Sequence, residues 1–279
     1  MTESLAGCWT ADGHVCTIVT DVAATTNQKA TFPYKVIRNP SKWKYSRLVS
    51  DADIVVLNNV SLKAIWIPLL LRRPTVAVHH SFYHPYGENQ SILEKAKVKI
   101  ARALAFNICV SHAVADRLHF AGPVIPNPYD DQLFSIQQSV VRNKDLVFLG
   151  RLVSEKGVSI LLAALMVLRR QDIRLNLMII GDGPEKISLQ NEVTDLGLQR
   201  QVEFIGEQQR QDLSKILNQH RVMVIPSLCD ETFGIVALEG IACGCRVVGS
   251  SGGGLAEAIG PAGSIFESGN AIDLANKIK

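Results

Sequence analysis

The chain has 279 residues, a length that exceeds one ordinary domain and fits two compact α/β domains. Its composition, 47% hydrophobic and 20% charged, is typical of a globular protein with a sizeable core. A formal net charge of +3 is too small to indicate nucleic-acid binding, which usually requires a dense basic face. The opening MTESLAGCWTADGH lacks the features of a signal peptide, and no apolar run is long enough to span a bilayer. We therefore expect a cytoplasmic protein with at most peripheral contact with the inner face of the membrane.

Short apolar runs alternate with helical spacing along the whole chain. The runs are continuous in apolar character, which predicts strands that are covered on both faces. Strands that alternate with helices predict parallel, doubly wound sheets. In chain order, the expected strands are residues 15–20, 54–57, 75–78, 106–110, 146–150, 175–180, 202–205, 222–225 and 246–249, and the clearest helical segments are 157–170, 188–196, 209–218 and 235–243.

A turn-rich and polar stretch, residues 126–141, interrupts this alternation and is typical of a linker. We therefore expect an N-terminal domain over residues 1–138 and a C-terminal domain over residues 139–279. Both should be Rossmann-like and should face each other across a cleft. In such sheets ligands bind at the carboxyl ends of the strands, so the loops that follow the strands are the places to look for chemistry.

The first informative segment is LVFLGRLVSEKG, where a buried strand is expected to end at Gly150. Arg151 and Lys156 flank the short loop that follows, and a helix is expected to begin at Gly157. Two cations and the free amides of a helix N-terminus at one strand end favour an anion. Solvated surface cations are the alternative interpretation.

The second informative segment is PSLCDETFGIVALEGIACG. It places Glu231 in the loop after a strand and Glu239 in the second turn of the next helix. A carboxylate is unusual among residues as apolar as those of this helix. A functional role is therefore favoured over helix capping by Glu231 and a solvated position for Glu239.

Together these segments resemble the family 4 retaining glycosyltransferases of GT-B fold, which include sucrose synthases and bacterial mannosyl- and glucosyltransferases. Glu231 and Glu239 have seven residues between them, with F-G-I among those seven, as in the signature of the family. The segments GRLVSEKG, IIGDGP, VEFIG and SSGGGLAEAIG occur in the order that the family has. The resemblance covers nearly the whole chain.

The resemblance implies catalytic roles for four residues. Arg151 and Lys156 would bind the donor diphosphate and stabilise the charge of the leaving group without a metal ion or another cofactor. Glu231 would contact the transferred sugar. In VAVHHSFY, His80 would hydrogen-bond near the sugar and the acceptor, with His79 as the alternative because the histidines form a doublet.

Further residues are implied to bind the donor. Glu239 would accept hydrogen bonds from the ribose hydroxyls, and the loop 206–208 would lie near the base. The remaining donor-binding residues comprise backbone positions beside the sugar and phosphates, the base-side loop and polar wall positions, namely Gly150, Phe233, Gly234, Ile235, Gly206, Glu207, Ser111 and Asn127.

The implied reaction moves a hexosyl group from a UDP-, GDP- or ADP-sugar to a lipid, saccharide or small-molecule acceptor, with retention of anomeric configuration. A dinucleotide-dependent oxidoreductase is disfavoured because GDGPEK does not match G-x-G-x-x-G. A glycoside hydrolase is disfavoured because both glutamates come from one loop and helix. The first strand with its glycine-rich loop and the C-terminal crossing helices of the family have no counterpart here, so truncation at both ends is expected. A truncated fragment that binds nucleotide sugar without turnover is therefore the alternative.

Overall fold

The computed structural model describes residues 2–23, 32–83, 91–104 and 106–279. It divides into two compact units, Met1–Val110 with Ala115–Ile125, and Ser111–Val114 with Pro126–Lys279. Both units contain parallel strands joined by helices, so the predicted α/β class with parallel sheets is confirmed. The boundary between residues 138 and 139 stays a prediction. Within the described ranges, no helix combines the length and the apolar character needed to cross a membrane.

The described residues of the N-terminal unit form two small parallel sheets. One pairs β1 (Thr17–Thr20) with β2 (Lys35–Arg38), and the other has β4 (Thr75–His79) between β3 (Val55–Asn58) and β5 (Phe106–Cys109). The strand expected at residues 15–20 begins only at Thr17, because Val15 is fully exposed. The sequence did not predict β2. The helices in this part of the chain are α1 (Thr2–Ala11), α2 (Lys42–Asp51), α3 (Leu62–Leu70), α4 (Ile92–Leu104) and α5 (His112–Leu118).

The C-terminal unit is built on one parallel sheet of six strands. In spatial order these are β11 (Gly263–Phe266), β10 (Arg246–Ser250), β9 (His220–Ile225), β6 (Lys144–Leu149), β7 (Leu177–Ile180) and β8 (Val202–Gly206). The strand order reverses between β6 and β9, which are neighbours in the sheet although β7 and β8 lie between them in the chain. Ligands bind outside the carboxyl ends of the strands at such a reversal.

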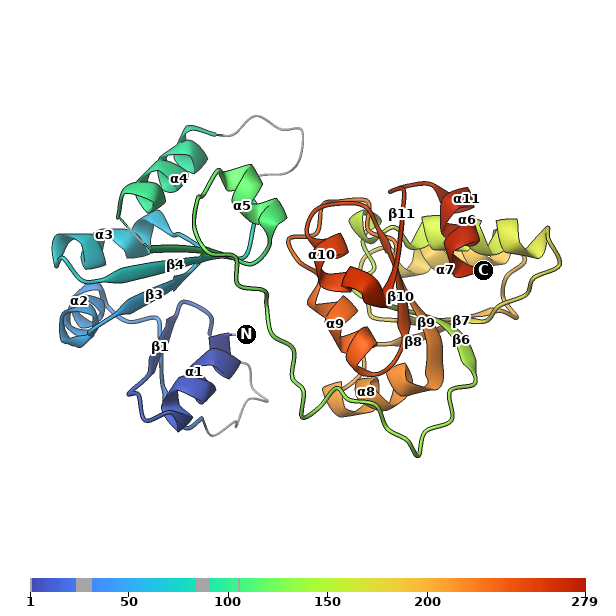
Figure 1. Ribbon diagram of the computed structural model, residues 1–279, viewed down its shortest axis with the longest axis horizontal. Helices are drawn as coiled ribbons and strands as arrows, with labels where there is room; N and C mark the ends of the chain where they lie inside the picture. The colour runs from blue at the N-terminus through green and yellow to red at the C-terminus, as the bar shows by residue number, and fades with distance from the viewer. Residues whose placement is uncertain (1, 24–31, 84–90, 105) are drawn as a thin grey trace. The chain divides into compact units, whose positions relative to one another are not determined.

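Helices cover both faces of this sheet (Figure 1). On one face lie α6 (Val158–Arg169), α7 (Lys186–Asp195) and α11 (Ala271–Ile278). On the other lie α8 (Arg210–Gln219), α9 (Ile235–Ala242) and α10 (Leu255–Ile259), and two short 3₁₀ turns complete the unit, η1 (Ser154–Lys156) and η2 (Gly260–Ala262).

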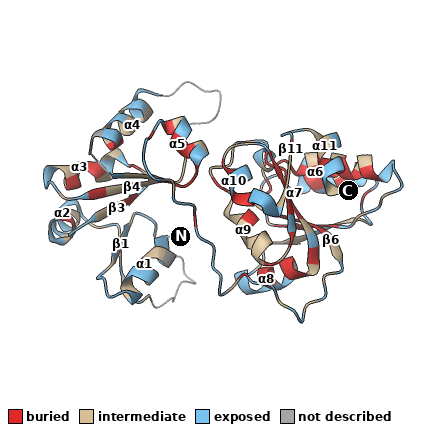
Figure 2. Ribbon diagram, viewed as in Figure 1, coloured by how far each residue is buried: buried red, intermediate tan, exposed pale blue. Residues whose placement is uncertain are grey.

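The core of the C-terminal unit explains why its strands were predictable. All four residues of β7 are buried, and Leu161 and Leu165 of α6 pack into the same cluster as Phe148 and Val224. Figure 2 shows buried residues along the sheet and on the helix sides that face it. Because both faces are covered at β7, that strand reads as a continuous apolar run.

The stretch that was expected to be a linker lies against α8. Ser214 and Asn218, two almost fully buried polar residues of α8, face it. The Ser214 hydroxyl donates to the carbonyl oxygen of Leu133 at 2.6 Å, and the Gln137 amide donates to Asn218 Oδ1 at 2.8 Å. Polar side chains on the buried side of α8 therefore hold a segment that has no regular hydrogen-bond ladder of its own.

Candidate functional site

The loop after β6 lies directly against the loop after β9. The Leu228 amide donates to the carbonyl oxygen of Glu155 at 2.8 Å. Gly157, which precedes α6, has a φ of +65°, and a Cβ atom there would lie 2.0 Å from the carbonyl oxygen of Pro226. Only glycine combines this backbone conformation with so close an approach. The two loops at the reversal of strand order therefore form one surface.

This surface contains an ion pair between two predicted site residues. Lys156 Nζ lies 2.5 Å from Glu231 Oε1, and the two side chains are 24% and 19% exposed. Partial burial strengthens such a pair relative to one on the open surface. The structure thus brings together two residues that lie 75 positions apart in the chain.

Glu231 has further support from its surroundings. The Ser227 hydroxyl donates to the same Oε1 atom at 2.6 Å, and the Gly254 amide donates to the Glu231 carbonyl oxygen at 2.7 Å. Gly253 has a φ of +65°, and a Cβ atom there would lie 2.1 Å from that carbonyl oxygen. The glycine run therefore packs against the backbone of the Glu231 loop.

Sequence reasoning found the glycine run only through the resemblance, and it missed Ser227. The available signal was a serine immediately after the expected end of a strand, four residues before the glutamate. That signal is weak on its own, because serine is common in any turn.

Arg151 and Gly150 directly follow β6. The Gly150 amide donates to the carbonyl oxygen of Ile180 at 3.0 Å, which extends the ladder to β7 by one residue. The Arg151 side chain is exposed, and it makes no hydrogen bond or ion pair with the residues that the structure describes. Its guanidinium is therefore available to an anionic ligand beside the loop of Lys156.

Glu239 occupies a different environment from Glu231. It lies on α9, its side chain is 12% exposed, and its Oε1 atom is 3.7 Å from Nη2 of Arg210, the first residue of α8. Burial raises the pKa of Glu239, the positive charge of Arg210 opposes this rise in pKa, and the negative charge of Asp130 adds to it. Arg210 is a neighbour that sequence reasoning did not identify.

The segment that leads into α9 is supported by a buried aromatic side chain and by Ser111. Phe233 is buried, and Gly234 precedes the first helical residue, Ile235. Ser111 is fully buried, and its hydroxyl donates to the carbonyl oxygen of Thr232 at 2.7 Å. Ser111 therefore supports the segment that leads into α9, and a direct contact of Ser111 with the donor stays a prediction.

The base-side loop begins at the last residue of β8. Gly206 ends the strand, Glu207 is exposed, and the Gln208 side chain donates to the carbonyl oxygen of Ile205 at 2.8 Å. Asn127 is mostly buried at the beginning of the C-terminal unit. The contacts of these residues with a nucleotide stay predictions.

The two histidines of the doublet differ in their surroundings within the N-terminal unit. His79 ends β4 and is fully buried, with Nδ1 2.8 Å from the Tyr83 hydroxyl and Nε2 2.8 Å from Asn107 Oδ1. Burial lowers the pKa of His79. His80 follows the strand, and its Nε2 atom lies 3.1 Å from Asn58 Oδ1. Because both nitrogens of His79 are engaged in the core, His80 remains the candidate for catalysis.

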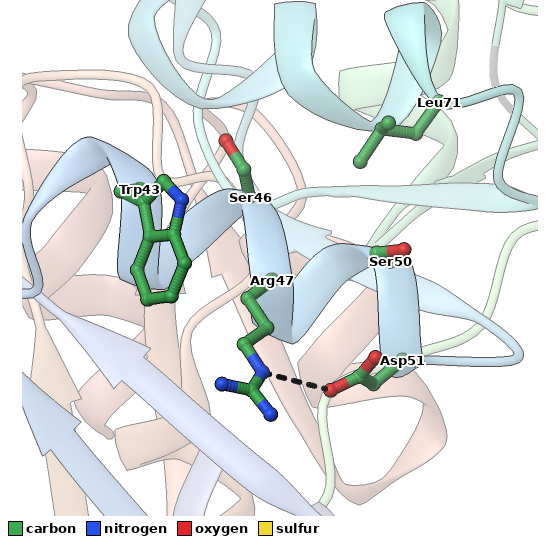
Figure 3. A pocket seen from close by; sticks show the side chains of 6 residues that line it. All are labelled: Trp43, Ser46, Arg47, Ser50, Asp51 and Leu71. Carbon is green, nitrogen blue, oxygen red and sulfur yellow. Dashed lines mark ion pairs between the residues drawn. The ribbon is translucent and has the colours of Figure 1, made fainter.

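Two hollows of the surface lie away from these residues. One of about 310 Å³ lies on the N-terminal unit beside α2, with an Arg47–Asp51 ion pair at its edge (Figure 3), and is lined by Trp43, Ser46, Arg47, Ser50, Asp51 and Leu71. The other, of about 410 Å³, lies in the C-terminal unit, where residues near the starts of β6 to β9 line it.

Residues 130–279, more than half of the chain, match the family described as glycosyl transferases group 1. An uncharacterized glycosyltransferase of Methanocaldococcus jannaschii is 40% identical over 117 residues, which are 42% of this chain and 29% of that protein. The glycogen synthase of Mycobacterium tuberculosis is 37% identical over 115 residues, which are 41% of this chain and 28% of that protein. The matched part of the chain thus spans less than a third of the length of these two curated relatives.

Solved structures share the fold of the chain at low sequence identity. Anabaena HepE in complex with UDP and glucose superposes with a TM-score of 0.78 at 23% identity, covering 99% of this chain and 84% of that one. Sucrose-phosphate synthase from Thermosynechococcus elongatus gives a TM-score of 0.75 at 20% identity, covering 99% of this chain and 81% of that one. These similarities confirm the fold that the sequence predicted.

Proposed function

The chain belongs to the glycosyl transferases group 1 family, and we propose that it is a family 4 retaining hexosyltransferase that uses a nucleotide-sugar donor without a metal ion. The observation that supports this most is the Lys156–Glu231 ion pair, which lies at the carboxyl ends of β6 and β9 where the strand order reverses. A cation and a carboxylate in contact suit a ligand that has a diphosphate joined to a sugar.

In this proposal, Arg151 and Lys156 bind the donor diphosphate. Cleavage of the bond between the sugar and the diphosphate leaves negative charge on the departing phosphate oxygen, and fixed cations stabilise that charge. Glu231 contacts the transferred sugar, and Glu239 accepts hydrogen bonds from the ribose. Because HepE was crystallised with UDP and glucose, UDP-glucose is the first donor to test, followed by GDP- and ADP-sugars.

Retention of anomeric configuration and the acceptor class rest on the motif resemblance. We propose a lipid, saccharide or small-molecule acceptor, with His80 near the transferred sugar. A turnover assay decides between this enzyme and a chain that binds nucleotide sugar without turnover. Nucleotide release should be measured for each donor with and without candidate acceptors, and donor binding should be measured by thermal shift, because a ligand that binds the folded state raises the midpoint. Binding with no turnover of any donor would favour the second possibility.

We expect nucleotide-sugar binding to be independent of divalent metal ions. Arg151 and Lys156 supply positive charge where a metal ion would otherwise neutralise the diphosphate. Calorimetric titration of UDP-glucose should give the same dissociation constant with EDTA as with added Mg²⁺. Loss of binding on chelation, restored by Mg²⁺, would contradict the metal-free proposal.

We also expect nucleoside affinity to depend on the charge of Glu239. Removing this acceptor in Glu239→Ala should cost about 1.5–3 kcal/mol of nucleoside binding free energy, as for hydrogen bonds to charged groups. Because burial raises the pKa of Glu239, the carboxylate is lost on acidification at a higher pH than for an ordinary glutamate. As the pH is lowered from neutral toward the ordinary pKa range of a carboxyl group, the nucleoside affinity of the wild type should therefore decrease.

Arg210→Ala tests whether the pH at which nucleoside affinity is lost shifts in the expected direction. Arg210 lowers the pKa of Glu239, so its removal should raise that pKa further and move the loss of affinity to higher pH. Arg221→Ala is the matched control, because Arg221 lies 3.4 Å from the carboxylate of Asp145. Titration with the free nucleoside avoids protonation of the phosphates. If the pH profile of nucleoside affinity does not shift in Arg210→Ala, Glu239 is excluded as the titrating group.

A further inference from the structure

We propose that Ser227 is a positioning residue that fixes the orientation of the Glu231 carboxylate for reaction. The proposal rests on the proposed function of the site, and it assigns a role to a residue that the sequence motifs did not identify.

The position of Ser227 is itself well determined. It lies two residues after the end of β9, is 1% exposed, and its carbonyl oxygen accepts a hydrogen bond from the Ser268 hydroxyl at 3.2 Å. Its hydroxyl donates to Glu231 Oε1 at 2.6 Å. The hydroxyl group that donates this hydrogen bond therefore lies on backbone that follows the central sheet directly, within the core of the unit.

Glu231 needs a hydrogen-bond donor of fixed position because Lys156, the other side chain that contacts it, is flexible. The terminal torsion of a glutamate is broad, so the carboxylate turns easily. Lys156 contacts the same Oε1 atom, but a lysine ammonium on a four-carbon stem is a point charge that does not fix the plane of a carboxylate. A second donor with a fixed direction restricts this rotation.

The pattern of contacts leaves one oxygen for a ligand. Oε1 receives both Lys156 and Ser227, whereas Oε2 makes no hydrogen bond or ion pair with any residue in the described part of the chain. Ser227 therefore holds the carboxylate with Oε1 toward the protein and Oε2 available to the transferred sugar. A misplacement of about 1 Å in a reacting geometry costs as much as 10²-fold in rate.

The test compares Ser227→Ala with Ser227→Thr, which keeps the hydroxyl, and with Ser159→Ala as a matched control. Ser159 on α6 also donates to a glutamate, with its hydroxyl 2.7 Å from Glu192 Oε2. For each variant, kcat and KM for nucleotide release from the donor, the Kd of UDP and the melting temperature should be measured.

We expect Ser227→Ala to lower kcat roughly tenfold to hundredfold, with the Kd of UDP within about threefold of the wild type. Ser227→Thr should recover most of kcat, and Ser159→Ala should leave kcat unchanged. Wild-type kcat in Ser227→Ala would overturn the proposal. A loss of kcat matched by equal losses in UDP affinity and melting temperature would also overturn it, because that result indicates a purely structural role.

A separate readout distinguishes this inference from the proposed function. If the wild-type chain turns over no nucleotide sugar, the proposed function fails, and a crystal structure of Ser227→Ala then decides the positioning role. A Glu231 carboxylate that turns away from its wild-type orientation supports positioning by Ser227. A carboxylate in the wild-type orientation contradicts it.

Discussion

Lys156→Ala should reduce donor turnover roughly 10²–10³-fold, the usual loss for one group that stabilises developing negative charge. The structure explains why the effect should be large. Lys156 is one of two cations expected at the diphosphate, and it also contacts the carboxylate of Glu231. Its removal therefore takes away positive charge that would stabilise the leaving group, and it leaves the Glu231 carboxylate with one fewer hydrogen-bond donor.

Nucleoside affinity should change little in the same variant, because Glu239, which is expected to bind the ribose, has Arg210 as its neighbour. Steady-state kinetics with the donor and titration with the free nucleoside separate the two effects. Lys186→Ala is a matched control, since it breaks another lysine–carboxylate ion pair of the unit, to Asp182 at 2.7 Å. An undiminished kcat in Lys156→Ala would remove the leaving-group role.

The contact also predicts strong coupling between the two positions. Residues that share an ion pair have non-additive mutational effects, whereas distant residues add. The double variant Lys156→Ala/Glu231→Gln should therefore lose much less than the product of the two single losses. Additive losses would show that the ion pair has no part in turnover.

The sequence predicted the C-terminal sheet well because its strands are buried on both faces. A run such as that of β7 has apolar residues at every position, and burial of all four explains the pattern. The sequence did not predict the strands β2 and β11, because neither is a continuous run of buried apolar residues. Two of the four residues of β2 are basic, and β11 begins with Gly263 and, among the described residues, pairs with β10 alone. Such strands form because a neighbouring strand offers hydrogen bonds, which is information that local sequence lacks.

The candidate site was predictable as residues but not as contacts. Lys156 and Glu231 each stood out at the end of an expected strand, yet nothing in their spacing indicates an ion pair between them. The contact depends on β6 and β9 being neighbours, which is a property of the sheet order. The histidine doublet is similar, because the alternation of burial along β4 decides that His79 faces the core.

Gly253→Ala should have a large effect although it removes no functional side chain. A Cβ atom at this position would lie 2.1 Å from the carbonyl oxygen of Glu231, a distance that no relaxed contact allows. The same carbonyl oxygen accepts a hydrogen bond from the Gly254 amide at 2.7 Å, so the two loops cannot separate without losing that bond. Because Glu231 itself would have to move, turnover should fall by roughly 10²-fold or more.

Stability should fall in the same variant, and a second glycine separates the two causes. Alanine at the φ of +65° of Gly253 costs roughly 1–3 kcal/mol as backbone strain alone. Gly269 has a φ of +80° in the same unit, but the nearest atom to its added Cβ is 3.8 Å away, so Gly269→Ala introduces strain without a collision. Chemical denaturation should show a loss of stability in both variants, larger in Gly253→Ala, and only Gly253→Ala should lose turnover. Equal turnover in the two variants would mean that the glycine run does not hold Glu231 in place.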